Sequence, residues 1–195
     1  PMNTPSYWNH RYAQDDIPWD AGGITRPLQR LIDGLEDKSM RILIPGAGRG
    51  HEAKYLQEQG FREVYVCDWA PLALEALRRT APDFPQEKLL QEDFFELDME
   101  VELILEQTFF CAIPRRMRPR YVEKTHKLLS EGGQVAGLFF NREFPHEGPP
   151  HGGSEAEYRR LFEPFFELHE LHPAPDSIGP RLGAELFFRF QKKEV

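Results

Sequence analysis

Three glycines at alternate positions follow a short apolar run. Gly46, Gly48 and Gly50 come directly after residues 40–44, and a segment with helical periodicity begins at His51. Glycine lets the backbone turn tightly and approach a ligand, and the amides at the start of a helix point toward that ligand. The G-x-G-x-G spacing lacks the third glycine of G-x-G-x-x-G, so it favours a ligand without a pyrophosphate. A tight turn with no ligand is the alternative interpretation.

Two acidic positions follow later apolar runs. Asp68 ends the run at 63–67, about 20 residues after the glycine loop, where a carboxylate can accept hydrogen bonds from both hydroxyls of a ribose. A helix cap ahead of Pro71 is its alternative role. Asp93 and Phe94 follow the next run, where the pair could bind an adenine amino group and cover one ring face. A turn residue and a core aromatic are the alternative for that pair.

These residues need a scaffold in which β-rich runs alternate with helical segments, a pattern typical of βαβ units and a parallel sheet. We expect strands at 40–44, 63–67, 88–91, 101–106 and 134–140, and helices at 51–59, 71–79, 116–129 and 154–162. The glycine pair at 132–133 would stop the third helix, and Ser154 with Glu157 predicts a capping box on the fourth. Two closing strands at 165–171 and 184–191 flank a Gly179-Pro180 turn and predict an antiparallel hairpin. The sequence therefore predicts an α/β fold with a seven-stranded, mostly parallel sheet.

Composition narrows the class of protein. The 195 residues suit one domain, and the net charge of −8 with scattered basic residues excludes nucleic acid as the main partner. No apolar run is long enough to span a membrane, and no export signal begins the sequence. Cys67 and Cys111 lie in apolar stretches, so we expect buried free thiols in the cytoplasm, and the seven histidines show no metal-ligand spacing. We expect a monomer without metal, nucleic-acid or membrane partners.

Longer segments carry a family resemblance across nearly the whole chain. They are YWNHRYAQDDIPWDAGG, LIPGAGRGHEAKYL, VCDWAPLAL, EDFFEL, EQTFFCAIPRRMRPRY and GPPHGGSEAEY. The chain resembles the thiopurine S-methyltransferase family, above all its plant and bacterial thiol and halide methyltransferase branch. The resemblance implies a Rossmann-like class I methyltransferase with helices on both faces of its sheet. Its cofactor would be S-adenosylmethionine, and its acceptor a thiol, halide, thiopurine or chalcogen compound.

The resemblance also assigns residues. It implies that residues 1–37 form a helical cap over a core at 38–195, within one domain. The cofactor positions that it implies are Trp8, Tyr12, Trp19, Gly46, Gly48, Asp68, Trp69, Asp93, Phe94 and Glu106. Glu106 would lie near the methionine part of the cofactor. For the aromatic residues, packing in the core is the alternative role.

Three positions depart from the family pattern. Tyr12 stands where the family often has Trp, and residues 106–110 read EQTFF where the family often has DYTFF. His151 follows the GPP turn, where an aromatic residue is common. These departures leave the cofactor expectation in place and leave the acceptor open.

Methyl transfer from a sulfonium is an in-line displacement, so the protein mainly aligns the nucleophile, the methyl carbon and the sulfur in a dry site. For a thiol acceptor, His151 could remove the proton. Arg118 matches an arginine that the family sets near the active site and could hold an anionic nucleophile. An exposed loop histidine and a solvated charge are the alternative roles. A nucleotide-dependent oxidoreductase and a non-catalytic cofactor-binding protein are the competing functions.

Overall fold

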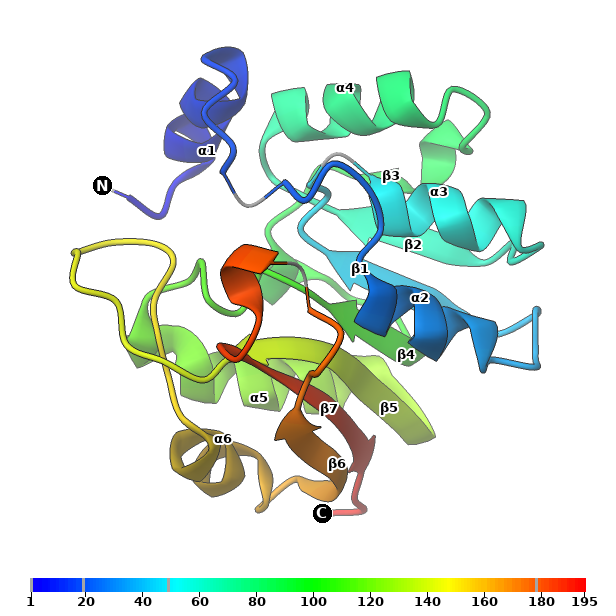
Figure 1. Cartoon of the computed structure of the whole chain (residues 1–195). Helices are drawn as coiled ribbons and strands as arrows, with labels where there is room; N and C mark the ends of the chain where they lie inside the picture. The colour runs from blue at the N-terminus through cyan, green and yellow to red at the C-terminus, as the bar shows by residue number, and fades with distance from the viewer. Residues whose placement is uncertain (1, 19, 49, 178) are drawn as a thin grey trace.

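The computed structural model describes residues 2–18, 20–48, 50–177 and 179–195. A seven-stranded sheet with the order β3-β2-β1-β4-β5-β7-β6 runs through it (Figure 1). The strands are β1 (Ile42–Pro45), β2 (Val64–Cys67), β3 (Leu89–Leu90), β4 (Val101–Glu106), β5 (Leu129–Phe140), β6 (Phe166–Pro173) and β7 (Glu185–Lys192). Strands β1 to β5 pair in parallel, and β7 pairs antiparallel with both β5 and β6. The predicted sheet with its closing antiparallel hairpin is confirmed.

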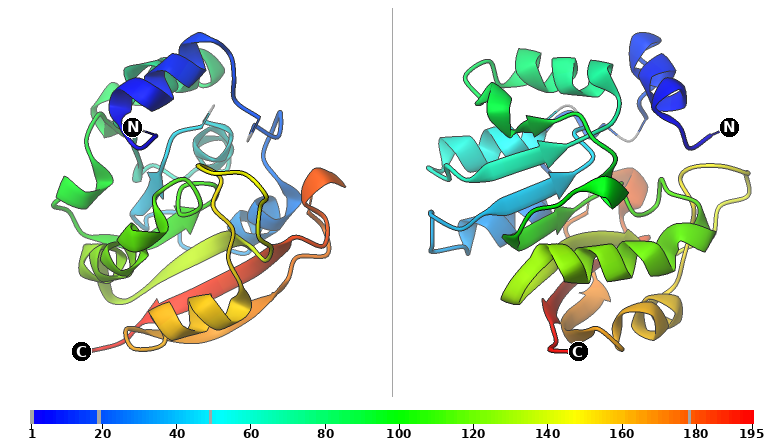
Figure 2. Two further views of the ribbon diagram at one scale, coloured as in Figure 1. Left: turned by 90° about the vertical axis from the view of Figure 1, so that its left-hand side faces the viewer. Right: turned by 180° about the vertical axis from the view of Figure 1, so that it is seen from behind.

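Helices cover both faces of this sheet (Figure 2). They are α1 (Pro5–Ala13), α2 (Arg26–Asp33), α3 (His51–Glu58), α4 (Pro71–Thr80), α5 (Arg118–Leu128) and α6 (Glu155–Phe162), with 3-10 turns η1 (Gln86–Lys88), η2 (Phe94–Glu96), η3 (Arg115–Met117) and η4 (Gly179–Arg181). The apolar core follows the same division. Leu103 and Leu105 of β4 pack in the cluster that holds α2, α3 and α4, while Ile104 packs in the cluster that holds α5 and α6. Side chains alternate between the two faces of a strand, so β4 contributes residues to both clusters.

Two predicted details differ from the structure. The glycine pair does not end a helix: α5 ends at Leu128, β5 begins at once, and Gly132 lies inside β5 where the pairing with β4 shifts register. A strand that absorbs extra residues in this way forms a bulge, which suits glycine. The capping box is only half formed. Ser154 Oγ accepts from the amide of Glu157 at 3.3 Å, but the Glu157 carboxylate binds Arg118 instead of the start of its own helix.

The N-terminal segment crosses the open end of the sheet. Helix α1 packs against α4, and Asn9 Oδ1 accepts a hydrogen bond from the amide of Leu72 at 3.0 Å. The chain then passes to α2, which the sequence interpretation placed only within a cap and did not predict as an element. Among the described residues, no helix has the length and apolar content to cross a membrane. The strand order reverses between β1 and β4, the place where α/β sheets form a ligand crevice.

Candidate functional site

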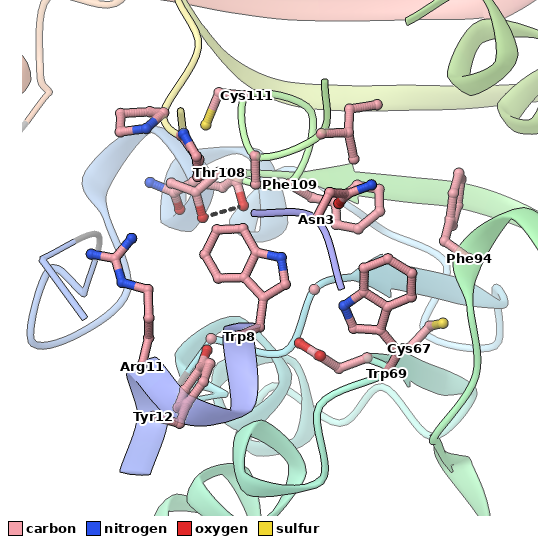
Figure 3. A pocket seen from close by; sticks show the side chains of 18 of the residues that line it. Asn3, Trp8, Arg11, Tyr12, Cys67, Trp69, Phe94, Thr108, Phe109 and Cys111 are labelled. Atoms are coloured by element: carbon pink, nitrogen blue, oxygen red, sulfur yellow. Dashed lines mark hydrogen bonds between the residues drawn. The ribbon is translucent and has the colours of Figure 1, made fainter. Parts of the chain in front are cut away.

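A cavity of about 530 Å³ lies between α1 and the carboxyl ends of the neighbouring parallel strands (Figure 3). Its walls come from α1, the loops that follow β1, β2, β3 and β4, the loop between β5 and α6, and Arg181 of η4. A volume of this size suits a small-molecule site. The cavity therefore occupies the crevice that the strand order creates.

The glycine loop presents bare backbone to the cavity. Gly46 has a φ of +80°, and its amide donates a hydrogen bond to Cys67 O at 2.7 Å. The ring of Phe109 packs against it so closely that a Cβ at position 46 would lie 3.3 Å from that ring. Gly48 has a φ of +55°, and a Cβ there would meet nothing within 4 Å. Both conformations favour glycine. A ligand can thus approach the backbone at Gly48 without meeting a side chain.

Asp68 joins the glycine loop to the end of β2. Its Oδ2 accepts from the amide of Ala47 at 2.9 Å, and its Oδ1 accepts from the amide of Ala70 at 2.8 Å. Burial raises the pKa of this carboxyl to about 6, although the backbone hydrogen bonds oppose the rise. The carboxylate also lines the cavity, and each oxygen keeps a lone pair for a hydroxyl group.

Aromatic side chains surround the same part of the cavity. Trp8 and Tyr12 reach it from α1, and Trp69 reaches it from the loop after β2. Phe94 is buried against Tyr121, with ring centroids 5.6 Å apart, yet it also forms part of the wall. Phe94 therefore serves as a core residue and as a wall residue.

Most of the predicted cofactor positions meet at this cavity. Asp93 lies beside Phe94, and its Oδ1 accepts from the amide of Phe95 at 3.0 Å, which is the turn role weighed for it. Trp19 falls outside the described residues. The predicted positions that line the cavity are Trp8, Tyr12, Gly46, Gly48, Asp68, Trp69, Asp93 and Phe94.

Glu106 lies behind the cavity wall and not in it. It is fully buried; Oε2 accepts from the amide of Phe109 at 3.0 Å, and Oε1 accepts from the amide of Phe110 at 3.1 Å. The Tyr121 hydroxyl also donates to Oε1 at 2.8 Å. Burial raises the pKa of Glu106 to about 7 despite these donors. The carboxylate thus fixes the loop that follows β4 from behind the wall, and a place near the methionine part of the cofactor stays a prediction.

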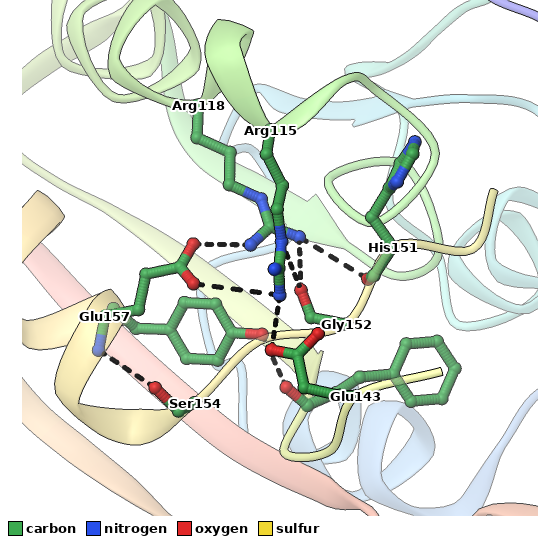
Figure 4. Close-up of polar contacts among 9 residues, drawn as sticks. Arg115, Arg118, Glu143, His151, Gly152, Ser154 and Glu157 are labelled. Atoms are coloured by element: carbon green, nitrogen blue, oxygen red, sulfur yellow. Dashed lines mark hydrogen bonds and ion pairs between the residues drawn. The ribbon is translucent and has the colours of Figure 1, made fainter. Parts of the chain in front are cut away.

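Arg118 is not one of the residues that line the cavity. Figure 4 shows its contacts with Glu157 and Gly152. Its buried guanidinium lies over the ring of Phe110 at 4.6 Å, donates to the Glu157 carboxylate and donates to Gly152 O at 2.8 Å. Helix α5 begins at Arg118, so this side chain ties α5 to α6 and to the loop before it. Because Arg118 does not line the cavity, its position gives no support to a catalytic role.

His151 also lies outside the set of wall residues. Its amide donates to Cys111 O at 2.7 Å, and its carbonyl accepts from Arg118 at 3.4 Å. Burial lowers the pKa of the half-buried ring, and the cations Arg118 and Arg115 lower it further. The ring is therefore neutral at pH 7, as a base must be, but the structure does not place it at the reacting position.

Three basic residues in the wall were not predicted from the sequence. Arg11 reaches the cavity from α1, where it also binds Asp16; His146 lies in the loop after β5, and Arg181 lies in η4. The guanidinium of Arg181 donates to the side-chain oxygen of Gln107 at 2.9 Å. Of the three, only Arg11 could have been expected to reach the cavity, because Arg11 directly precedes Tyr12 in the predicted cap. The other two lie in loops whose paths the sequence does not specify.

The wall residues fit a cofactor that carries adenosine and a charged amino-acid chain. The open space at Gly48 admits a ligand against the backbone, Asp68 offers acceptors for ribose hydroxyls, and Trp69 and Phe94 offer faces for a ring. No group of three or more potential metal ligands occurs among the described residues. The arrangement suits binding and alignment of two organic molecules.

Comparison with known proteins agrees with this geometry. The family model described as "Thiopurine S-methyltransferase (TPMT)" matches residues 3–192. The chain is 30% identical to "Probable thiol methyltransferase 2" of Arabidopsis thaliana over 99% of this chain and 88% of that protein. It is 29% identical to "Thiocyanate methyltransferase 1" of Brassica oleracea over 95% of this chain and 84% of that protein.

A solved structure shares the fold. The 1,6-didemethyltoxoflavin-N1-methyltransferase of Burkholderia thailandensis, solved with 1,6-didemethyltoxoflavin and S-adenosylhomocysteine, superimposes with a TM-score of 0.77. The match covers 97% of this chain and 87% of that one at 20% identity, so it speaks for the fold alone. The family match spans all the segments that build the cavity. The chain therefore belongs to the thiopurine S-methyltransferase family and is an S-adenosylmethionine-dependent methyltransferase of small molecules.

Proposed function

We propose that the enzyme methylates a small anionic sulfur nucleophile, a thiolate or thiocyanate. We further propose that this acceptor binds beside Arg11 and Arg181, the part of the cavity called here the arginine end. The division of charge along the wall carries the proposal. Three of the four carboxylates on the wall, Asp68, Glu92 and Asp93, follow β2 and β3 where the wall suits adenosine. The guanidinium groups of Arg11 and Arg181 lie elsewhere on the wall, which has one further carboxylate, Glu147. An anionic acceptor is attracted to guanidinium groups and repelled by the carboxylates.

The shape of the arginine end supports a small acceptor. Phe140, at the end of β5, and Pro149 and Pro150, in the loop that follows, add apolar surface to the wall, and the cavity must hold the cofactor as well. In Figure 3, Arg11 and Thr108 lie on the side of the cavity away from Trp69 and Phe94. Sulfur nucleophiles are polarizable and weakly hydrated, so an apolar wall beside a cation suits them. The names of two relatives, a thiol methyltransferase and a thiocyanate methyltransferase, point in the same direction.

In this proposal the chain binds, orients and excludes water. The cofactor lies against the backbone of Gly48, and Asp68 binds its ribose. Trp8 and Tyr12 cover it from α1. The bound S-adenosylmethionine supplies an electrophilic methyl group on a sulfonium sulfur. Arg11 and Arg181 orient the acceptor and favour its ionised form, which is the reactive one for a thiol. His151 as a base remains an alternative that needs a path to the acceptor.

A turnover screen with labelled S-adenosylmethionine tests the acceptor class. We expect small aliphatic and aromatic thiols and thiocyanate to be methylated with higher kcat/KM than 6-mercaptopurine, whose rings need more room. Iodide, an anion without sulfur, separates charge recognition from a requirement for sulfur. Preferred methylation of 6-mercaptopurine or of a neutral amine would contradict the proposal. Arg181→Met should lower kcat/KM for thiocyanate while cofactor affinity stays within about twofold.

Two further expectations stay proposals. We propose that the enzyme acts in a reducing compartment such as the cytoplasm, which the unpaired buried thiols of Cys67 and Cys111 support. We also propose a monomer, because the only large apolar side chains exposed among the described residues are the scattered Met2, Leu182 and Val195. Light scattering at micromolar concentration tests the oligomeric state, and a dimer mass would contradict it.

A further inference from the structure

Glu106 is a buried carboxylate whose part in the reaction remains unexplained. Its side chain is 0% exposed and accepts three hydrogen bonds, from the amides of Phe109 and Phe110 and from the hydroxyl of Tyr121. Among the described residues, no lysine, arginine or histidine forms an ion pair with it. A buried charge without a countercharge is costly, so it calls for a compensating interaction in the working enzyme.

The carboxylate lies one residue layer behind the cavity. The carboxylate accepts a hydrogen bond from the amide of Phe109. Phe109 in turn lines the cavity and lies against Gly46 of the glycine loop. Cys111 also lines the cavity. Burial, and to a smaller extent the negative charge of Glu106, raise the pKa of the Cys111 thiol to about 12. The field of Glu106 therefore reaches into the cavity.

The other groups that face Glu106 do not cancel its charge. From α5, Tyr121 donates its hydroxyl, and its own pKa is raised well above the usual value by burial and by Glu106. From β5, Gly137 contributes backbone alone, since a Cβ there would overlap the carbonyl of Glu106. Arg118 donates to Glu157 and Gly152, and Arg181 lies 4.0 Å from the Glu185 carboxylate, so neither cation forms an ion pair with Glu106.

We propose that ionised Glu106 acts as an electrostatic positioning residue that makes the cavity bind the sulfonium form of the cofactor in preference to its neutral demethylated product. The donor carries a fixed positive charge on sulfur, and that charge disappears when the methyl group leaves and the sulfur becomes a thioether. Two unit charges about 10 Å apart at an effective dielectric constant of about 20 attract strongly enough to change an affinity roughly tenfold.

This preference has a consequence for turnover. The attraction stabilises the charged ground state more than the transition state, in which the sulfonium charge is already shrinking, so it does not accelerate the chemical step. It does weaken binding of S-adenosylhomocysteine relative to the donor and so favours product release. The inference depends on the cofactor and not on which acceptor the enzyme uses.

The test compares the dissociation constants of S-adenosylmethionine and S-adenosylhomocysteine by isothermal titration calorimetry. In Glu106→Gln, which keeps the shape of the side chain and removes its charge, the preference for the sulfonium ligand should fall roughly tenfold. Glu106→Asp keeps the charge and should keep the preference. Tyr121→Phe removes a hydrogen bond that lowers the pKa of Glu106, so the same preference should appear in this variant only at a higher pH than in the wild type.

A measurement on the unaltered enzyme covers the case in which Glu106→Gln does not fold. Burial raises the pKa of Glu106 to about 7, so the preference for S-adenosylmethionine should increase as the pH rises from about 7 to about 8.5. Asp68, with a pKa of about 6, is already mostly ionised across this range. Amino and carboxylate groups are common to both ligands and largely cancel in the ratio. Binding of the sulfonium ligand near pH 7 should release a proton, seen as a dependence of the binding enthalpy on the buffer.

The outcomes separate clearly. An affinity ratio that is unchanged in folded Glu106→Gln, or independent of pH in the wild type, overturns the proposal. An equal fall in both affinities in Glu106→Gln would assign Glu106 to loop structure alone and would also overturn it. If neither ligand binds the wild-type protein, the cofactor assignment itself fails, and the proposal fails with it.

Discussion

The carboxylate of Asp68 holds the glycine loop in place from the neighbouring strand, because Oδ2 accepts a hydrogen bond from the amide of Ala47 at 2.9 Å. This single contact joins the two elements that nucleotide-type sites combine, the loop after the first strand and the acid after the second. It also means that Asp68 has two separable functions. One is to fix the loop, and the other is to bind the cofactor hydroxyls.

Asp68→Ala should weaken binding of S-adenosylmethionine and S-adenosylhomocysteine alike by roughly 1.5–3 kcal/mol, the scale of hydrogen bonds to a charged group. Calorimetric titration measures both affinities. Asp83→Ala, at an exposed turn position, is the matched control and should leave them unchanged. If Asp68→Ala binds both ligands normally, then Asp68 serves the loop and not the cofactor.

The raised pKa of Glu106 predicts how stability depends on pH. Its folded pKa is about 7 against an ordinary value of 4.5, so the group stabilises the fold most below pH 4.5, and that stabilisation is lost as the pH rises through 7. The loss is on the order of 3 kcal/mol. Chemical unfolding at several pH values should show a smaller decline for Glu106→Gln than for the wild type. Parallel curves for the two proteins would contradict the raised pKa.

Arg118 should matter for folding more than its absence from the cavity wall would suggest. Arg118→Met leaves the Glu157 carboxylate and the carbonyl of Gly152 without their donor, so unfolding free energy should fall by roughly 3 kcal/mol. Arg116→Met, an exposed neighbour, should change it by less than about 0.5 kcal/mol. Denaturant melts measure both. If Arg118→Met melts normally but loses turnover, the catalytic role expected from the family resemblance is restored.

Helix α1 should contribute to turnover more than to stability. None of its residues is buried, yet Trp8 and Tyr12 form cavity wall, so removing α1 exposes the cofactor to water at little cost to the core. A chain that begins at residue 14 should keep its melting temperature within a few degrees and lose most of its activity. Trp8→Ala should raise the KM for the cofactor, whereas His10→Ala, exposed on the same helix, should not. Full activity of the shortened chain would exclude a lid.

The sequence predicted the sheet and the cofactor end of the site because both depend on local patterns. Apolar runs, glycine spacing and an acid at a strand end mark β1, β2 and Asp68 directly. The inward direction of Glu106 was also present as a signal, since strand alternation puts it on the same face as Ile104, toward α5. Helix α2 had signals too, with Thr25 before it and Pro27 in its first turn, but it is short.

The acceptor end was less predictable, for a physical reason. Arg11 on α1, His146 in the loop after β5 and Arg181 in η4 come from segments far apart in the chain. Each side chain reaches the cavity only because of how the chain folds between these segments. Arg118 lies in a matching motif, yet the partner that turns it away from the cavity, Glu157, lies 39 residues later. Motif matching locates a residue in the chain but does not give the direction of its side chain.

The pH dependence of thiol methylation decides how the acceptor loses its proton. His151 does not line the cavity, whereas Arg11 and Arg181 do, so we expect the thiol to ionise before it binds. The rise of kcat/KM with pH should then follow the pKa of the acceptor: an aromatic thiol with a low pKa should reach its plateau at lower pH than an alkyl thiol. His151→Ala should leave both profiles unchanged.

Iodide provides the control, because it carries no proton and its methylation should lack this rising limb. A base on the enzyme would behave differently, since its own pKa would set the limb for every thiol. Burial and neighbouring cations lower the pKa of His151, so such a limb would rise below the ordinary histidine value of 6.5 and would disappear in His151→Ala, with a loss of roughly 10²-fold in rate. A limb at one common pH for both thiols that vanishes in this variant would make His151 the base, and the ionised-acceptor mechanism would be wrong.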